Sequence, residues 1–217
     1  MKKLVTSAVL AAATMASVPA MAELSANAAL TTNYMWRGAT QSTDDIAVQG
    51  GADWANESGL YAGVWASTLG DNPGNEVDLY VGKKLGAMGP IADVDAGVII
   101  LTNTDDLLGA GDAIELKLAG SVAVVNAELY VSLDAPANTS YTYLTANTEF
   151  DVSGITVTPY LGTAGGDASG THFGVSAGKE ISGFDISALI DIADKNSSGT
   201  GADETKVSIT ASKGFDL

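Results

Sequence analysis

Residues 46–67 read IAVQGGADWANESGLYAGVWAS, and side-chain character alternates along both halves of this stretch. The apolar residues Val48 and Trp54 are at even-numbered positions, whereas the acidic residue Asp53 is at an odd-numbered one. The sequence NESG at residues 56–59 is a turn signal. Because successive side chains of a strand point to opposite faces, the stretch predicts two strands joined by a tight turn, with one apolar and one more polar face.

The same alternation recurs along the chain. It predicts twelve strands, at residues 24–38, 46–55, 60–67, 76–84, 91–101, 113–119, 122–132, 141–152, 155–162, 171–181, 184–192 and 204–217. The connections after even-numbered strands are short, at residues 56–59, 85–90, 120–121, 153–154 and 182–183. The connections after odd-numbered strands are longer and rich in Asp, Asn, Gly and Ser.

Tight turns at one end and longer loops at the other are typical of outer-membrane barrels, with the turns in the periplasm. An even number of strands places both termini at the turn end, where the first and last strands pair and leave no open edge. The predicted fold is therefore all-β, a single up-and-down antiparallel transmembrane β-barrel of about 12 strands, with short periplasmic turns and longer extracellular loops.

The first 22 residues have the pattern of a secretory signal. Lys2 and Lys3 precede a mostly apolar stretch at residues 4–18, and Ala20 and Ala22 supply the small residues that a signal peptidase reads. We therefore expect a signal peptide at residues 1–22 that is cleaved before Glu23, and one outer-membrane barrel domain at residues 23–217. No later run approaches the length of about 18 apolar residues that a membrane-spanning helix requires. The predicted location is the outer membrane of a Gram-negative bacterium.

The composition excludes several classes of function. Residues 1–22 hold two of the 10 basic residues and none of the 26 acidic ones, so the mature chain has a net charge of −18. Such a chain is unsuited to nucleic acid, because phosphate contacts need clustered Lys and Arg. The absence of cysteine excludes disulfides and thiolate metal sites, and a single histidine argues against a zinc enzyme. No cofactor and no metal are expected.

The direction of the two faces decides the class of protein. In a membrane barrel the apolar face meets lipid and the polar face lines the lumen, whereas in a soluble secreted or periplasmic β-protein the apolar face turns inward. Aromatic residues near the ends of the apolar face favour lipid, because interfacial girdles have this pattern. The girdle candidates are Tyr34, Trp36, Trp54, Phe150, Phe173, Phe184 and Phe215.

The polar face supplies the candidate pore. Its predicted lumen-lining residues are Arg37, Gln49, Asp53, Trp65, Glu76, Asp78, Asp93, Asp95, Glu115, Lys117, Glu128, Glu149, Asp151 and Asp191, with Asp185 and Lys206 on the same face. Twelve tilted strands about 4.8 Å apart enclose a backbone radius of roughly 12 Å, which leaves a narrow lumen. We predict a porin-like channel for small solutes or ions that prefers cations. The alternative is a non-conducting scaffold, in which the acidic residues pair and plug the lumen.

Two further interpretations start from particular residues. Arg37 closes the first predicted strand, where it either binds an anionic solute group or pairs with an acid such as Asp191 or Glu204. His172 raises the alternative of a lipid-modifying enzyme. Ser176 lies four residues away, about 13 Å along a strand, which is beyond hydrogen-bond reach, and Ser169 lies in a loop. We therefore predict no catalytic residue.

The outer loops raise the alternative of surface binding. They carry Asp71, Asn72, Asp105, Asp106, Asp112, Asp194 and Asp203, which are residue types that hold Ca²⁺, but no EF-hand spacing is present. The expected partners of the barrel are outer-membrane lipid and lipopolysaccharide, the outer-membrane assembly machinery during insertion, and small solutes or cations.

The first third of the mature chain resembles the TorF-family porins, a proteobacterial outer-membrane protein family of unknown substrate. The matching stretches are AALTTNYMWRG at residues 28–38, Gln41, AVQGGADWANESGLYAGVW at residues 47–65 and EVDLYVG at residues 76–82. The chain departs from the family pattern at Ile46, where members usually have Pro, and at Leu217, where they commonly end on an aromatic residue. The resemblance implies an outer-membrane barrel and a pore, but supplies no substrate and no site residues.

Overall fold

The computed structural model describes residues 23–71, 74–109, 112–134, 140–166, 169–197 and 200–217, so the predicted signal peptide lies outside the described residues. The strands are β1 (Glu23–Thr31), β2 (Met35–Trp36), β3 (Ala39–Thr40), β4 (Ala47–Ala55), β5 (Leu60–Thr68), β6 (Asn75–Met88), β7 (Ile91–Asn103), β8 (Ala113–Val122), β9 (Val125–Asp134), β10 (Tyr141–Asn147), β11 (Phe150–Val152), β12 (Ile155–Gly166), β13 (Gly170–Ile181), β14 (Phe184–Ala193) and β15 (Glu204–Asp216). In the described part of the chain, no helix is long and apolar enough to span a membrane.

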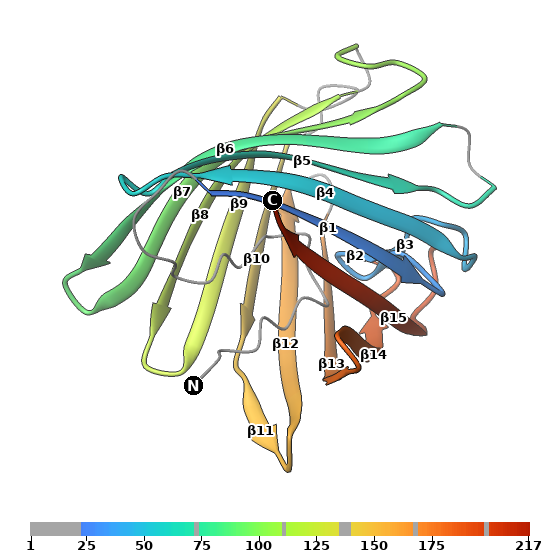
Figure 1. The fold of residues 1–217 in the computed structure, drawn as a ribbon. Coiled ribbons are helices and arrows are strands. Elements are labelled where there is room, and N and C mark those ends of the chain that lie inside the picture. The colour runs from blue at the N-terminus through green and yellow to red at the C-terminus, as the bar shows by residue number, and fades with distance from the viewer. Residues whose placement is uncertain (1–22, 72–73, 110–111, 135–139, 167–168, 198–199) are drawn as a thin grey trace.

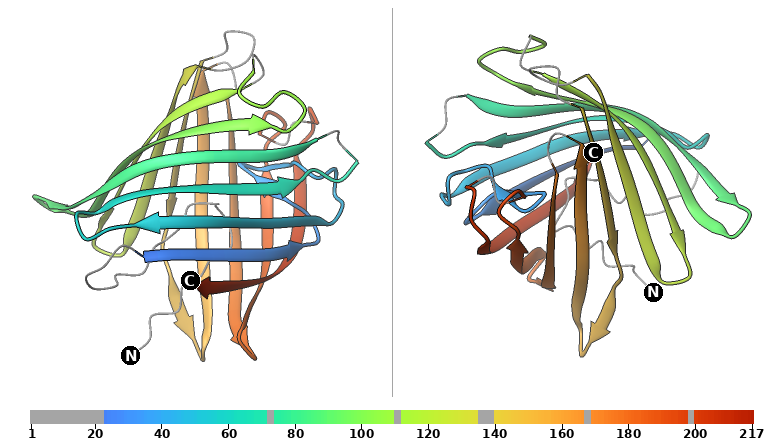
Figure 2. Two further views of the ribbon diagram at one scale, coloured as in Figure 1. Left: turned by 45° about the horizontal axis from the view of Figure 1, so that its top comes forward. Right: turned by 180° about the vertical axis from the view of Figure 1, so that it is seen from behind.

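The wall strands close into an antiparallel barrel (Figures 1 and 2). Consecutive wall strands are neighbours, and β1 pairs with β15 through contacts such as Ala28 with Lys213. The circle is completed where β10 pairs with β12, for example Thr145 with Gly162. A break at residues 148–149 separates β10 from β11, and both pair with β12. Together they form one wall strand, which makes twelve in the described residues and confirms the predicted fold class.

The outer face of the wall is apolar and the inner face is polar, as the side-chain pattern predicts. On β10, Tyr143 and Thr145 are buried inside the barrel, whereas Leu144 between them is 46% exposed on the outside. The large exposed side chains are mainly outward-facing Leu, Val, Ile and Phe along nearly every wall strand. An apolar outer surface and a polar interior fit a barrel in lipid and not a soluble barrel with an apolar core.

The turns at the periplasmic end are tight because their residues adopt left-handed backbone conformations. Ser182 and Gly183 have φ values of 54° and 81°, the pattern of a type I′ turn, whose twist matches that of the flanking strands. Two of the predicted turns are displaced along the chain. The hairpin of β6 and β7 extends to Gly89, and the turn between β8 and β9 lies at residues 123–124, not 120–121. In both places the strands continue through a glycine, Gly86 in β6 and Gly120 in β8, beyond the predicted ends.

The first strand was predicted to run to residue 38, and this was wrong. β1 ends at Thr31, and residues 32–46 turn into the barrel as a loop that contains the short hairpin of β2 and β3. We call residues 32–46 the inner hairpin. The alternation continues unbroken through Trp36 because β2 is itself extended, so periodicity alone does not show where the chain leaves the wall.

This course of the chain corrects two of the girdle assignments. Tyr34 is only 6% exposed and meets the inward-facing Trp65 edge-on, with ring centroids 5.4 Å apart. Trp36 lies under the guanidinium of Arg37. Both residues therefore lie in the barrel interior, and their assignment to the lipid interface was wrong. The other candidates face outward, and all except Phe173 are near the periplasmic ends of their strands, namely Trp54, Phe150, Phe184 and Phe215.

Candidate functional site

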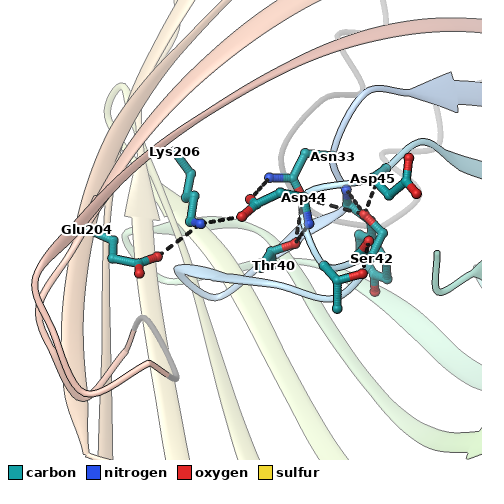
Figure 3. Close-up of polar contacts among 9 residues, drawn as sticks. Asn33, Thr40, Ser42, Asp44, Asp45, Glu204 and Lys206 are labelled. Carbon is teal, nitrogen blue, oxygen red and sulfur yellow. Dashed lines mark hydrogen bonds and ion pairs between the residues drawn. The ribbon is translucent and has the colours of Figure 1, made fainter. Parts of the chain in front are cut away.

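The inner hairpin is held in shape by its own polar side chains (Figure 3). Asn33 is the centre of this network, because its amide nitrogen donates to Asp44 Oδ1 at 2.7 Å and its amide oxygen accepts from Thr40 Oγ1 at 2.6 Å. Ser42 is fully buried; it accepts from the backbone N–H of Tyr34 and donates to the carbonyl of Asp45. A segment with this many internal hydrogen bonds is an ordered element that occupies the lumen.

One ion pair fastens the base of the inner hairpin to the wall. Lys206 projects inward from β15, and its Nζ lies 2.6 Å from Asp44 Oδ2 and 3.1 Å from Glu204 Oε2 (Figure 3). Lys206 was predicted to lie on the inner face, and the structure places it there. Asp44 is half exposed, so this pair is a weaker constraint than a buried one.

The tip of the inner hairpin is a tight turn with Arg37 and Gly38 at its centre. Their φ values are 52° and 88°, so both residues adopt the left-handed conformation that a type I′ turn requires. Glycine adopts it freely, but a residue with a Cβ does so at a cost of roughly 1–2 kcal/mol. The surrounding contacts of Arg37 must offset this cost.

Those contacts reach the opposite wall. Arg37 donates from both terminal nitrogens to Glu115 of β8, over 2.6 Å to Oε1 and 2.8 Å to Oε2. The side chains of Arg37 and Glu115 are only 10% and 1% exposed. A parallel two-bond pair of this kind is among the stronger polar contacts in proteins. Its partner differs from the predicted ones, because Asp191 and Glu204 are engaged elsewhere.

Aromatic rings enclose the same guanidinium. The central carbon of Arg37 lies 4.2 Å from the ring centroid of Trp36, 4.5 Å from that of Tyr143, 4.8 Å from that of Tyr130 and 5.8 Å from that of Tyr141. All four distances are within the range of cation–π attraction, which is strongest where water is excluded. We call Glu115, Tyr130, Tyr141 and Tyr143 the wall cage, since all four belong to β8, β9 and β10.

A second buried cluster supports the tip from the other side. His172 of β13 is 3% exposed, and a Cβ built on Gly38 would lie 2.9 Å from its Cβ. Its Nδ1 lies 2.9 Å from Asp191 Oδ2, and its Nε2 lies 2.8 Å from the Tyr143 hydroxyl. An ionised carboxylate only accepts, so Nδ1 carries the proton that it donates to Asp191. His172 therefore links the tip of the inner hairpin to the wall cage.

Inward tyrosines lie flat along the wall. A Cβ built on Gly63 would collide with the ring of Tyr80, and one built on Gly174 would collide with the ring of Tyr160. The hydroxyl of Tyr80 donates to Asp53, and that of Tyr160 donates to Asp191. Tyr61 over Gly82 repeats the arrangement, whereas Gly162 leaves room for the His172 ring and the Tyr143 hydroxyl where they meet. The inner glycines thus provide slots that keep the large rings against the wall and out of the lumen.

We expect Gly63→Ala to displace Tyr80 from its slot. The new methyl group occupies the position of the ring, so Tyr80 must swing inward and give up its hydrogen bond to Asp53, which then lies buried with one partner fewer. Loss of a hydrogen bond to a buried charged group costs roughly 1.5–3 kcal/mol. Urea unfolding of the refolded barrel measures this loss. Gly214→Ala is the matched control, because a Cβ at that inward glycine meets nothing within 4 Å. If the two variants were equally stable, this would contradict the conclusion that Gly63 provides the space for the Tyr80 ring.

The structure places the other predicted lumen residues at two depths. Gln49, Asp53, Trp65, Glu76, Asp78, Asp95, Glu115, Lys117, Glu128 and Asp191 project from the inner face of the wall strands. Lys117 lies 3.7 Å from Asp95 and 3.5 Å from Glu128. Asp93, Glu149 and Asp151 are exposed near the periplasmic rim, and Asp93 sits at a register shift in β7 with a φ of 51°. Whether any of these residues contacts a solute stays a prediction.

Sequence reasoning missed the tyrosines. Six further residues that project into the interior are Tyr61, Tyr80, Tyr130, Tyr141, Tyr143 and Tyr160. Each is at a position that alternation assigns to the polar face of its strand. Such a position, with glycine at the same level on a neighbouring strand, is a signal that could have identified them.

The outer loops contain no metal site in the described residues, where no group of three or more acidic or histidine side chains is placed to hold an ion. Asp194 illustrates the reason. Its carboxylate accepts backbone N–H bonds from Ser197, Asn196 and Thr171, and these bonds, that of Ser197 foremost, hold its pKa below the usual range. The carboxylate therefore serves to shape its own loop.

Solved outer-membrane proteins share this architecture. The KdgM porin aligns with a TM-score of 0.59 at 7% identity, covering 88% of this chain and 99% of that one. The NanC porin aligns with a TM-score of 0.55 at 10% identity, covering 89% and 99%. The COG4313 outer membrane channel from Pseudomonas putida F1 aligns with a TM-score of 0.52 at 11% identity, covering 96% and 100%. At such identities the likeness is one of fold, and it defines a porin-like barrel of the Gram-negative outer membrane.

The sequence itself matches a family over residues 14–173, and that family is described as "Bacterial protein of unknown function (Gcw_chp)". The match covers more than half of the chain, and the chain belongs to this family. No curated protein matches the sequence. The name TorF, which the resemblance of the first third suggests, stays a prediction.

Proposed function

We propose that the protein is an outer-membrane channel for small solutes or ions, and that the inner hairpin keeps it narrow. The observation that carries this proposal is the bidentate pair of Arg37 with Glu115, which spans the lumen from the first loop to the opposite wall. Tyrosines that lie flat in glycine slots suit a conduit, because their rings stay against the wall beside the inner hairpin. The porin folds of KdgM and NanC and the resemblance to TorF-family porins support the same function.

The charge of the interior supports a preference for cations. Asp53, Glu76, Asp78, Asp95, Glu115, Glu128 and Asp191 project inward from the wall, and the basic residues on the same inner side are Arg37, Lys84, Lys117 and Lys206. Excess carboxylates raise the local cation concentration in a narrow low-dielectric passage.

In a KCl gradient, we expect the single-channel current to reverse at a potential that has the sign of the K⁺ equilibrium potential. Glu128→Gln should move the reversal potential toward zero, because the substitution removes an inward carboxylate whose side chain is still 17% exposed and leaves the neighbouring Lys117 with one acidic partner fewer. Asp216→Asn, at the exposed periplasmic end of β15, is the control and should leave it unchanged. A reversal potential with the sign of the Cl⁻ equilibrium potential would refute the preference for cations.

A catalytic role is not part of this proposal. Both ring nitrogens of His172 are occupied, by Asp191 and Tyr143, and the imidazole is buried inside the barrel. Ser176 projects from the same face of β13 but makes no hydrogen bond to His172 among the described contacts. Unchanged phospholipid turnover by His172→Ala would agree with this. The proposed surroundings are outer-membrane lipid and lipopolysaccharide, after export by a signal peptide and insertion by the assembly machinery.

A further inference from the structure

We propose that the wall cage is a binding site for the guanidinium group of a solute, and that the Arg37 side chain occupies this site as an intramolecular ligand when no solute is present. The inference rests on the proposed channel function for its physiological meaning, because it names the class of solute that the channel receives. The site itself is defined by residues of β8, β9 and β10 alone.

The carboxylate of the site is already in position without the inner hairpin. Tyr141 donates from its hydroxyl to Glu115 Oε1 at 2.7 Å, which fixes the orientation of the carboxylate. Ile99 is the residue opposite Glu115 on β7, so the carboxylate has an apolar neighbour there. Lys117, the nearest wall cation along β8, lies against Asp95 and Glu128 instead. Departure of Arg37 therefore leaves a buried carboxylate that strongly favours a new cationic partner.

The rings of the cage select for a flat, delocalised cation. Tyr143 and Tyr130 have ring centroids 4.5 Å and 4.8 Å from the guanidinium carbon, and both belong to the wall. A planar guanidinium can lie against these faces while it donates two parallel bonds to Glu115. Na⁺ and K⁺ make no such bonds. A tetramethylammonium ion fits aromatic cages but has no N–H to donate.

Arg37 is an imperfect occupant, which makes displacement by a free solute feasible. Its backbone is held in the left-handed region, and its Nε is buried without a hydrogen-bond partner. A free guanidinium reproduces the two bonds to Glu115 without the cost of the left-handed backbone at position 37. Against this, Arg37 is tethered, so it competes at an effective concentration that is typically millimolar for a short connection. Solute therefore has to reach the millimolar range or above to replace Arg37 in the wild-type protein.

The test uses the refolded full-length mature barrel in detergent, with guanidinium chloride as the probe and calorimetry as the readout. We expect Arg37→Asn to bind guanidinium at least tenfold more tightly than wild type, because the cage is vacated while Asn keeps the left-handed turn. The double variant Arg37→Asn with Glu115→Gln should lose at least tenfold of that affinity. NaCl and tetramethylammonium chloride at the same ionic strength should give no comparable heat.

Equal guanidinium affinity of the single and double variants would overturn the proposal, as would equal binding of tetramethylammonium. A second measurement uses wild type alone, in case the variants do not refold. Guanidinium, but not Na⁺, should increase hydrogen exchange in residues 32–46, and unchanged exchange would count against displacement. Both readouts are independent of ion conduction. A barrel that binds guanidinium but conducts no ions would refute the proposed channel and support the binding site. A barrel that conducts ions but does not bind guanidinium would support the channel and refute the binding site.

Discussion

Arg37→Asn will raise the ratio of open to closed time of the single channel at least about tenfold, where the closed state is the one in which the inner hairpin is seated on the wall cage. The substitution removes one member of a buried ion pair, which typically costs ~3–5 kcal/mol because the other charge remains buried. That cost falls on the state in which the inner hairpin is seated, and each 1.4 kcal/mol changes an equilibrium about tenfold. Asparagine tolerates the left-handed conformation at position 37, so the turn itself is preserved. Planar-bilayer recording of the purified protein measures the dwell times.

Two further variants identify the cause. Glu115→Gln should reproduce the effect, and the double variant should add little, because both substitutions break the same pair. Lys84→Asn removes an inward positive charge at the periplasmic end of β6, opposite Asp95, and it should leave the dwell times unchanged. A ratio of open to closed time in Arg37→Asn that matches that of wild type would show that the inner hairpin does not limit conduction.

Val64→Arg will destabilise the barrel in lipid by about 2–4 kcal/mol, the cost of an arginine on the lipid face near the bilayer midplane. Val64 is at the centre of β5, faces outward and is 38% exposed, with Ala52 and Leu79 as its neighbours across the sheet. Unfolding of the refolded protein in lipid vesicles by urea measures the loss.

Leu60→Arg provides the matched control on the same face of the same strand. Leu60 is the first residue of β5, opposite Lys83 at the periplasmic end, where a long side chain reaches the interface and the cost is about 0–1 kcal/mol. A depth-dependent difference between the two variants tests the membrane orientation directly. If both substitutions were harmless, the outer surface would face water and the barrel would be a soluble one.

The wall of the barrel was predictable because it depends on a local property. Leu144 between Tyr143 and Thr145 already shows which side chains face lipid, since a strand alternates its faces whatever surrounds it. The inner hairpin was not predictable in the same way. Tyr34 and Trp36 keep the alternation of the preceding strand, and Arg37-Gly38 has the composition of a turn. Only the closed barrel shows that this turn lies inside, because a loop turned inward and a loop turned outward have the same local pattern.

The sequence by itself determined the number of wall strands, the side of each strand that meets lipid, and the acidic character of the interior, because periodicity and charge are properties of neighbouring residues. The tertiary structure decided the partners of those charges. The pairing of Arg37 with Glu115 joins residues 78 positions apart and that of Asp44 with Lys206 joins residues 162 apart. Such contacts depend on how the sheet closes and how far a loop reaches across it, and neither quantity is recorded in any short stretch of the chain.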